Sequence, residues 1–197
     1  MRSQAAKDWL IVLMAVVMFG LQWTYRTESM SIWPPVAIVM IAVLLYLNEL
    51  KGYNWKTLFT SSFWESVGFA LFQGMIAQAV GIVIIIYGLG ITQPSINMTL
   101  TPAILISAVV FSAVFEELLY RKIIYSKLNR YMKFWPAAVI SSLLFAVSHY
   151  DYSAYIGNFL LGFVWCYAYR RSGNLGVVIA AHILFNTIAF AVMGLRG

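Results

Sequence analysis

The sequence contains very little charge and almost no cysteine. Only 10% of its 197 residues are Asp, Glu, Lys or Arg, whereas soluble domains usually carry about 25%. This scarcity excludes a soluble globular enzyme. Cys166 is the one cysteine, which excludes an internal disulfide and a zinc site built from several thiolates.

Apolar residues take the place of the missing charge. Hydrophobic residues make up 62% of the chain and aromatic residues 16%, and a disordered chain does not have this composition. The mean hydropathy of +0.82 indicates an integral membrane protein. Crossing the hydrocarbon core takes about 20 helical residues, so the chain has room for about seven or eight spans. We therefore expect one integral membrane domain over residues 1–197.

Long apolar stretches predict an all-α, polytopic bundle of about seven membrane-spanning helices. They are Trp9–Tyr25, Ile32–Leu47, Val67–Leu89, Pro102–Leu119, Phe134–His149, Ala154–Tyr169 and Leu175–Leu195. No small-residue cleavage site follows the first stretch, so we expect it to be retained rather than removed as a signal peptide. The aromatic-rich segment Gly52–Glu65 predicts an amphipathic piece at the membrane interface.

The basic residues are distributed unevenly over this topology. Only Arg26 and Arg196 fall on one side, and the other side receives Arg2, Lys7, Lys51, Lys56, Arg121, Lys122, Lys127, Arg130, Lys133, Arg170 and Arg171. The positive-inside rule then predicts a multi-pass cell-membrane protein with a cytoplasmic N-terminus. Anionic lipid headgroups account for the net charge of +6, so we expect membrane lipids and no nucleic acid as partners.

Few ionisable residues lie inside apolar stretches, where each costs several kcal/mol unless it is paired. We expect five acidic residues at helix ends or in loops to be solvated: Asp8, Glu28, Glu49, Glu65 and Asp151. Glu116 and Glu117 instead follow an unbroken apolar run. Arg121 lies four residues after Glu117, a spacing that favours a helical ion pair. Glu116 is rotated by about 100° and has no such partner, which leaves it free to act on another group.

The two histidines of the chain, His149 and His182, also lie in or at the end of apolar helices, and Asn186 follows His182 by one turn. A single intramembrane histidine ordinarily makes a hydrogen bond between helices. Two histidines, a glutamate pair, an arginine and an asparagine within one half of the chain favour a hydrolytic site. A carboxylate can serve as general base on a water, and imidazole and amide groups can orient the water or stabilise an oxyanion.

Other intramembrane hydrolases require motifs that this sequence lacks. It has no GxSG, GxGD or HExxH, the motifs of the serine, aspartyl and zinc types. A zinc site made of two histidines and a glutamate is disfavoured because the spacings match no zinc signature, so we expect no cofactor. Ser148 and Cys166 are weaker candidates for a nucleophile, since each is explained as a small packing residue.

Three segments resemble the motifs of a known family. Glu116–Arg121 resembles EExxxR, Phe145–His149 resembles FxxxH and His182–Asn186 resembles HxxxN/D. These are the motifs of the CPBP family of CAAX proteases and bacteriocin-processing enzymes, also called Abi, which includes the Ras-converting prenyl-protein endopeptidase. They occur in the expected order on three predicted helices, within a core of about residues 102–195.

The resemblance implies a metal-free, glutamate-dependent intramembrane endopeptidase whose substrate is membrane-associated, either prenylated or of the bacteriocin type. It implies that Glu116 and His149 activate the attacking water and that His182 and Asn186 form the oxyanion hole. Glu117 and Arg121 would support the site. One alternative is a non-catalytic membrane regulator or bacteriocin self-immunity protein that binds a partner. A transporter or channel is disfavoured because few polar residues are available to line a path.

The predicted helix boundaries place Glu116 and His149 near opposite faces of the membrane. A joint site therefore requires that the fourth helix continue into the basic segment after Leu119. It also requires a re-entrant turn at Tyr150–Ser153, which a membrane protein tolerates where the turn lines a polar cavity.

Overall fold

The computed structural model of the chain describes residues 3–25, 27–91, 101–149 and 153–194, which are helical and contain no strand. This confirms the all-α prediction. The first part of the chain forms α1 (Gln4–Thr24), α2 (Glu28–Leu45), α3 (Leu47–Gly52), the 3₁₀ turn η1 (Trp55–Phe59), α4 (Ser61–Val83) and the π-helical η2 (Ile84–Gly88). The second part contains one long composite helix followed by α8 (Phe134–Val147), α9 (Tyr155–Ser172) and α10 (Leu175–Gly194).

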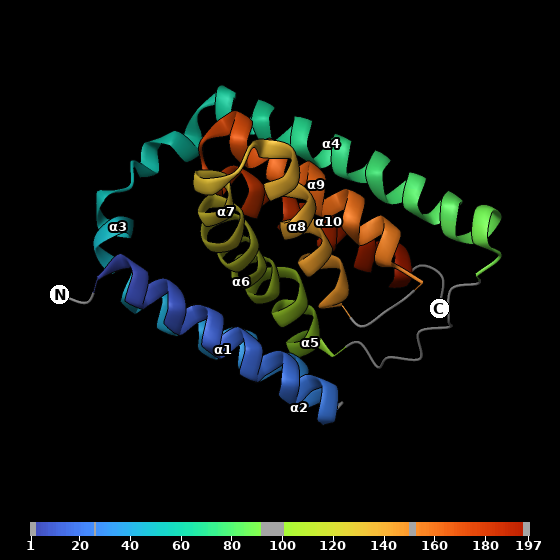
Figure 1. Cartoon of the computed structure of the whole chain (residues 1–197), viewed down its shortest axis with the longest axis horizontal. Helices are drawn as coiled ribbons and strands as arrows, with labels where there is room; N and C mark the ends of the chain where they lie inside the picture. Colours follow the sequence, from blue (N-terminus) through green and yellow to red (C-terminus); the bar gives the residue numbers. More distant parts are fainter. Residues whose placement is uncertain (1–2, 26, 92–100, 150–152, 195–197) are drawn as a thin grey trace.

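The helices form a bundle with two long edges. Figure 1 shows α1 and α2 side by side along one edge and α4 along the opposite edge, with the helices of the second half between them. Helix α9 packs against both α4 and α8, and α10 packs against α4 and α9. Glu116, His149 and His182 therefore come from elements in the interior of the bundle.

The composite helix runs without a break from Pro102 to Tyr131. It consists of α5 (Pro102–Ile106), η3 (Ser107–Ser112), α6 (Ala113–Glu116), η4 (Glu117–Tyr125) and α7 (Ser126–Tyr131), of which η3 and η4 are π-helical. Thr101 caps its start by accepting from the amide of Ile104, and proline is favoured at the next position. The predicted end at Leu119 is wrong, because the helix continues through the basic segment as a joint site requires. Extended π-helical geometry is rare, and π-helical turns are frequently found at functional sites.

In the described parts of the chain, four helical segments are long and apolar enough to cross a membrane: Gln4–Thr24, Ser61–Gly88, Pro102–Tyr131 and Leu175–Met193. The apolar helices Ser29–Leu45 and Phe134–Val147 are shorter. At 1.5 Å per residue, the 14 residues of α8 extend about 21 Å, less than the roughly 30 Å of the hydrocarbon core. Helix α8 therefore ends inside the apolar layer if it starts at a membrane surface.

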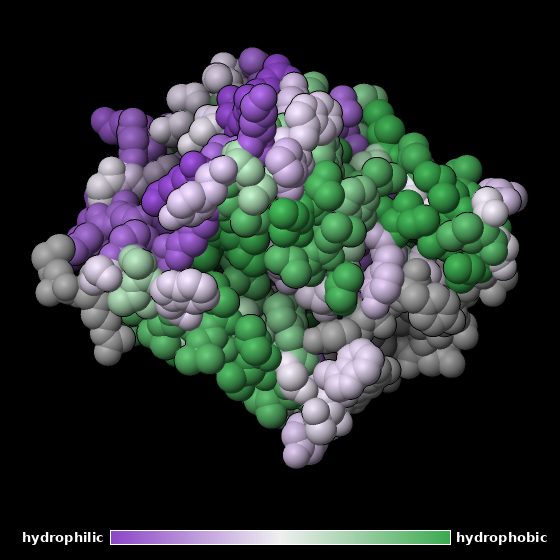
Figure 2. Space-filling view, in the orientation of Figure 1, coloured by the Kyte–Doolittle hydropathy of each residue, from purple (hydrophilic) through white to green (hydrophobic). Residues whose placement is uncertain are grey.

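Polarity separates along the molecule. Figure 2 shows strongly hydrophilic surface gathered at the end where α3 and η1 lie, whereas hydrophobic surface covers most of the remaining visible face. Lys122 pairs with Glu49, and Lys127 pairs with Asp8. These two basic side chains of the second half thus pair with carboxylates of the first half.

The prediction that Asp8 is a solvated charge is wrong. Its carboxylate is buried, accepts a hydrogen bond of 2.7 Å from the Tyr46 hydroxyl and lies 3.1 Å from Nζ of Lys127. These partners come from the end of α2 and from α7. The sequence around Asp8 does not predict that they pack next to α1. Asp8 joins the first helix to the composite helix.

Glycines allow α9 to approach its neighbours closely. A Cβ placed on Gly81 of α4 would lie 2.3 Å from Cα of Gly157, so the backbones of α4 and α9 are in direct contact. A Cβ on Gly162 would lie 3.1 Å from the ring of Phe145. Small residues at such crossings are a common feature of membrane helix packing, and here they bring the backbone of α9 up to α8.

Candidate active site

Glu117, Arg121 and His182 form a fully buried polar group at the centre of the bundle. Oε2 of Glu117 lies 3.1 Å from Nε of Arg121, and both side chains have 0% exposure. Nδ1 of His182 lies 2.8 Å from the other carboxylate oxygen of Glu117. Because the carboxylate is paired with a guanidinium and only accepts, Nδ1 of His182 is the donor. The ion pair predicted from the i,i+4 spacing is present, and a histidine from α10 extends it.

Arg121 is held by the backbone and rings of two other helices. Its Nη2 donates to the carbonyl of Gly162 on α9 at 3.3 Å, and its guanidinium lies 4.5 Å from the centre of the Phe145 ring on α8. Two serine hydroxyls donate hydrogen bonds to backbone carbonyls of the π-helical η4: Ser141 to Tyr120 O and Ser126 to Arg121 O. The buried guanidinium is therefore fixed by α8 and α9 as well as by Glu117.

Glu116 is the next residue along the chain, and its carboxylate faces two imidazoles. Its Oε2 lies 3.7 Å from Nε2 of His182 and 3.9 Å from Nε2 of His149. Both distances exceed the range of a direct hydrogen bond. Glu116 therefore stands next to the buried group formed by Glu117 without being locked into it, as the helical rotation between the two residues predicts.

The short length of α8 explains how His149 reaches Glu116. The helix ends at Val147, and His149 follows in a turn, where its Nδ1 donates to the carbonyl of Phe145 at 2.8 Å. The other ring nitrogen is thereby directed toward Glu116. Because Glu116 lies in the middle of the composite helix and His149 just after a short one, the two meet inside the bundle. The predicted turn at Tyr150–Ser153 falls mostly outside the described residues.

A cavity of about 80 Å³ opens beside Glu116. It is lined by Met18, Phe19, Gln22, Pro35, Ser112, Phe115, Glu116, Ser148 and His149. Of the six predicted site residues, only Glu116 and His149 line this cavity. The lining thus combines the Glu116 carboxylate and the His149 imidazole with the polar side chains of Gln22, Ser112 and Ser148 and with apolar side chains of α1 and α2.

Asn186 is not brought to the cavity. Its Nδ2 donates to the carbonyl of Ala108 in η3 at 3.2 Å. His182 is also outside the cavity lining, since it is buried behind Glu116 with Trp165 stacked on its ring at a centroid separation of 5.8 Å. The assignment of these two residues to an oxyanion hole stays a prediction.

Ser112 also lines the cavity, and it is not among the site residues predicted from the sequence. It lies one turn before Glu116, and its hydroxyl makes no hydrogen bond to any residue that the structure describes. By contrast, Ser107, Ser141, Ser142 and Ser148 all donate to backbone carbonyls. Its position four residues before the glutamate pair is the one sequence feature that points to it. Because serine is common in apolar helices, this feature does not single it out.

Within the described parts of the chain, no three histidine, cysteine or carboxylate side chains are grouped as ligands of one metal ion. In each of the two histidines, Nδ1 is hydrogen-bonded to an acceptor and Nε2 is directed at Glu116. This arrangement can position and deprotonate a small molecule between Glu116 and His149.

The comparisons with known proteins agree with the motifs. Residues 98–188 match the family model described as Rce1-like, type II CAAX prenyl endopeptidase. This segment contains the composite helix, α8, α9 and most of α10, and it includes all six predicted site residues. No curated protein and no solved structure matches the chain significantly. Over this segment, the chain is similar to the CPBP family of CAAX-type proteases in its Rce1-like form, and the match supports membership of that family.

Proposed function

We propose that the protein is a multi-pass cell-membrane endopeptidase that hydrolyses a peptide bond of a prenylated, membrane-associated substrate. The main support is the placement of the Glu116 carboxylate beside Nε2 of His149, in a cavity that Met18, Phe19, Pro35 and Phe115 also line. A prenyl group is apolar, and a family model described as a prenyl endopeptidase covers this part of the chain.

The separation of Glu116 and His149 suits an attacking water. A gap of 3.9 Å is too long for a direct hydrogen bond and short enough for one water to contact both atoms. In the proposed reaction, the water oxygen attacks the scissile carbonyl carbon while its proton passes to Glu116. The same proton is then delivered to the departing amide nitrogen as the C–N bond breaks. His149 orients the water through Nε2.

The two neighbouring glutamates are held differently. Glu117 is paired with Arg121, whereas the carboxylate of Glu116 faces two imidazoles. Glu116 is therefore the carboxylate that we assign to accept the proton of the attacking water.

The oxyanion needs hydrogen-bond donors near the carbonyl oxygen. The resemblance assigns this role to His182 and Asn186, and the Asn186 amide keeps a second N–H beyond the one given to Ala108 O. We add Ser112, because its hydroxyl lines the cavity and makes no bond to a described residue. In this proposal, Ser112 donates to the carbonyl oxygen of the bound peptide.

The topology supports access from the membrane. Basic residues border the hydrophilic end of the molecule, so we propose that this end is cytoplasmic, that the chain crosses the membrane about seven times and that its N-terminus is cytoplasmic. Met18, Phe19 and Pro35 of α1 and α2 contribute apolar side chains to the cavity lining. A lipid-modified segment would enter past these side chains without leaving the bilayer.

The test is cleavage of a farnesylated peptide ending in a CAAX sequence by the full chain in lipid nanodiscs. We expect Glu116→Gln and His149→Ala each to reduce the rate at least a hundredfold, since general base catalysis typically contributes a factor of 10²–10⁴. Glu49→Gln, which changes a carboxylate at the hydrophilic end, serves as control and retains activity. Normal cleavage by folded Glu116→Gln would overturn the proposal and favour the non-catalytic regulator or immunity protein.

A further inference from the structure

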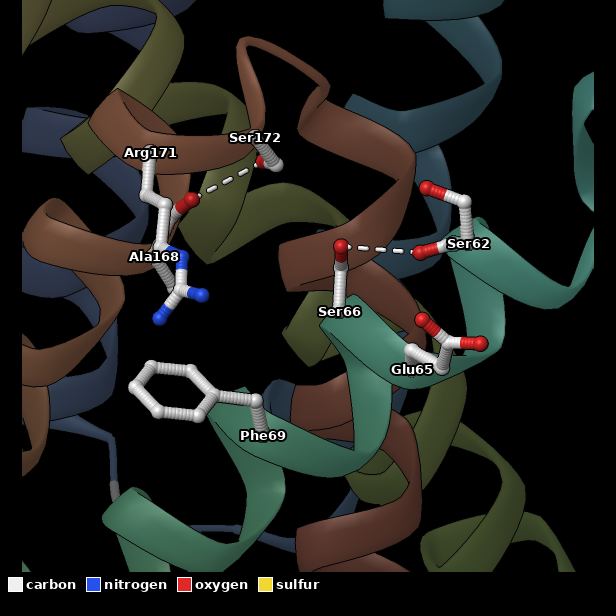
Figure 3. A pocket seen from close by; sticks show the side chains of 7 residues that line it. All are labelled: Ser62, Glu65, Ser66, Phe69, Ala168, Arg171 and Ser172. Carbon is white, nitrogen blue, oxygen red and sulfur yellow. Dashed lines mark hydrogen bonds between the residues drawn. The ribbon is translucent and has the colours of Figure 1, made fainter.

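A second hollow lies far from Glu116 in the fold, where α4 begins and α9 ends. It has a volume of about 230 Å³. Figure 3 shows its lining, with Ser62, Glu65, Ser66 and Phe69 from α4 on one wall and Ala168, Arg171 and Ser172 from α9 on the other. We call it the α4–α9 pocket. It shares no residue with the candidate active site.

Arg171 is the positive group of the α4–α9 pocket. Its guanidinium stacks over the ring of Phe69, 4.2 Å from the ring centre, and this contact restricts its orientation. Among the described residues, no carboxylate lies within ion-pair distance of it. A stacked guanidinium without a carboxylate partner retains its donors for a planar or tetrahedral anion, and phosphate is its usual ligand in proteins.

Glu65 adds a negative charge on the opposite wall (Figure 3). Ser66 donates to the carbonyl of Ser62 at 2.9 Å and Ser172 to that of Ala168 at 2.8 Å, so the lone pairs of both hydroxyl oxygens remain available to a donor. The α4–α9 pocket thus offers one cation and one carboxylate together with hydroxyl acceptors. This combination suits a zwitterion that has a phosphate and a primary ammonium group.

The surface that continues from the pocket along α4 is apolar. Phe69 is followed on the same helical face by Phe72, Ile76, Val80 and Val83, which are all exposed, at the i, i+3, i+7 spacing of one face. The pocket is smaller than the roughly 300 Å³ at which sites for drug-sized ligands begin. It therefore has room for a headgroup, while the exposed face of α4 provides a surface for acyl chains.

We propose that the α4–α9 pocket binds the phosphoethanolamine headgroup of a membrane phospholipid. The phosphate contacts Arg171 and the hydroxyl of Ser62, the ammonium contacts Glu65 and the serine oxygens, and one acyl chain lies along α4. None of these residues belongs to the candidate active site, so lipid binding in the α4–α9 pocket does not depend on peptide cleavage.

The experiment measures lipid retention by native mass spectrometry on the full chain in detergent, with phosphatidylethanolamine added at known concentrations. Arg171→Ala is expected to raise the apparent Kd for this lipid about tenfold. The matched control is Arg170→Ala, which removes the same charge one residue earlier. Arg170 stacks on Phe134 instead and does not line the pocket, so its loss should leave the Kd unchanged. Equal effects of both variants would show a general charge effect and overturn the proposal.

Two further arms test the chemistry of the ligand. Glu65→Gln should remove the preference for phosphatidylethanolamine over phosphatidylglycerol while the phosphate contact remains. A preference that persists in Glu65→Gln contradicts the assigned ammonium contact. Inorganic phosphate at millimolar concentration should fail to displace the lipid. Displacement by phosphate alone would identify a site for free phosphate and overturn the lipid assignment.

Discussion

Oε2 of Glu116 lies 3.9 Å from Nε2 of His149, although the apolar pattern of the sequence predicts that the two residues lie near opposite faces of the membrane. Their proximity depends on two lengths: the composite helix reaches Tyr131, and α8 ends at Val147. A helix long enough to span a membrane and a shorter helix beside it bring their candidate residues together. The site therefore depends on the lengths of these two helices as well as on the identity of its residues.

Arg121 should be required for stability as well as for activity. Removing one partner of a buried ion pair costs about 3–5 kcal/mol because the other charge stays buried and unpaired. We expect Arg121→Ala to lower the free energy of unfolding by about this amount in a denaturant titration in mixed micelles. Lys122→Ala, which breaks the partly exposed pair with Glu49, should cost less than about 1 kcal/mol. Similar losses in both variants would contradict the buried role of Arg121.

Ser112→Ala should slow catalysis with little effect on folding. Loss of one hydrogen bond to the reacting carbonyl corresponds to about 1.4 kcal/mol, or a tenfold decrease in kcat. KM for the farnesylated CAAX peptide should change by less than a factor of two. Ser142→Ala is the control, because the Ser142 hydroxyl is occupied by the Ala138 carbonyl. An unchanged kcat in Ser112→Ala would remove this serine from the mechanism.

Gly81→Ala should separate α4 from α9. The added Cβ would lie 2.3 Å from Cα and 2.5 Å from N of Gly157, and neither backbone atom can move aside alone. Overpacking of this kind typically costs 1–3 kcal/mol, so we expect about a 2 kcal/mol loss of stability. At Gly68 on the same helix, nothing lies within 4 Å of the added atom. Gly68→Ala should therefore be neutral, and equal behaviour of the two variants would contradict the close crossing.

Chelators should not inhibit the peptidase. The proposed mechanism obtains its nucleophile by proton transfer to Glu116 and uses no Lewis acid. We expect full cleavage of the farnesylated peptide after treatment with 1,10-phenanthroline. We also expect elemental analysis of the purified protein to find less than about 0.1 zinc per chain. Inhibition that added zinc reverses would require a metal-dependent mechanism instead.

Interactions within one helix were predictable from the sequence. The Glu117–Arg121 pair follows from i,i+4 spacing, and the different surroundings of Glu116 and Glu117 follow from the rotation between neighbouring helical residues. Both are properties of a single segment, so no knowledge of the bundle is needed to derive them.

Interactions between helices were not predictable in the same way. The burial of Asp8 depends on Tyr46 and Lys127, which are distant along the chain and have no spacing relation to it. The predicted end of the fourth helix at Leu119 was wrong because hydropathy falls there while the backbone stays helical. Hydropathy locates apolar surface, and it does not determine where hydrogen bonding along a helix stops.

The cavity draws its two walls from different halves of the chain. Glu116 and His149 belong to the segment matched by the family model, whereas Met18, Phe19, Gln22 and Pro35 precede it. Substitutions at these four positions should change the shape of the cavity without changing Glu116 or His149. Exchanging α1 and α2 between members of the family should therefore transfer substrate preference separately from the chemistry.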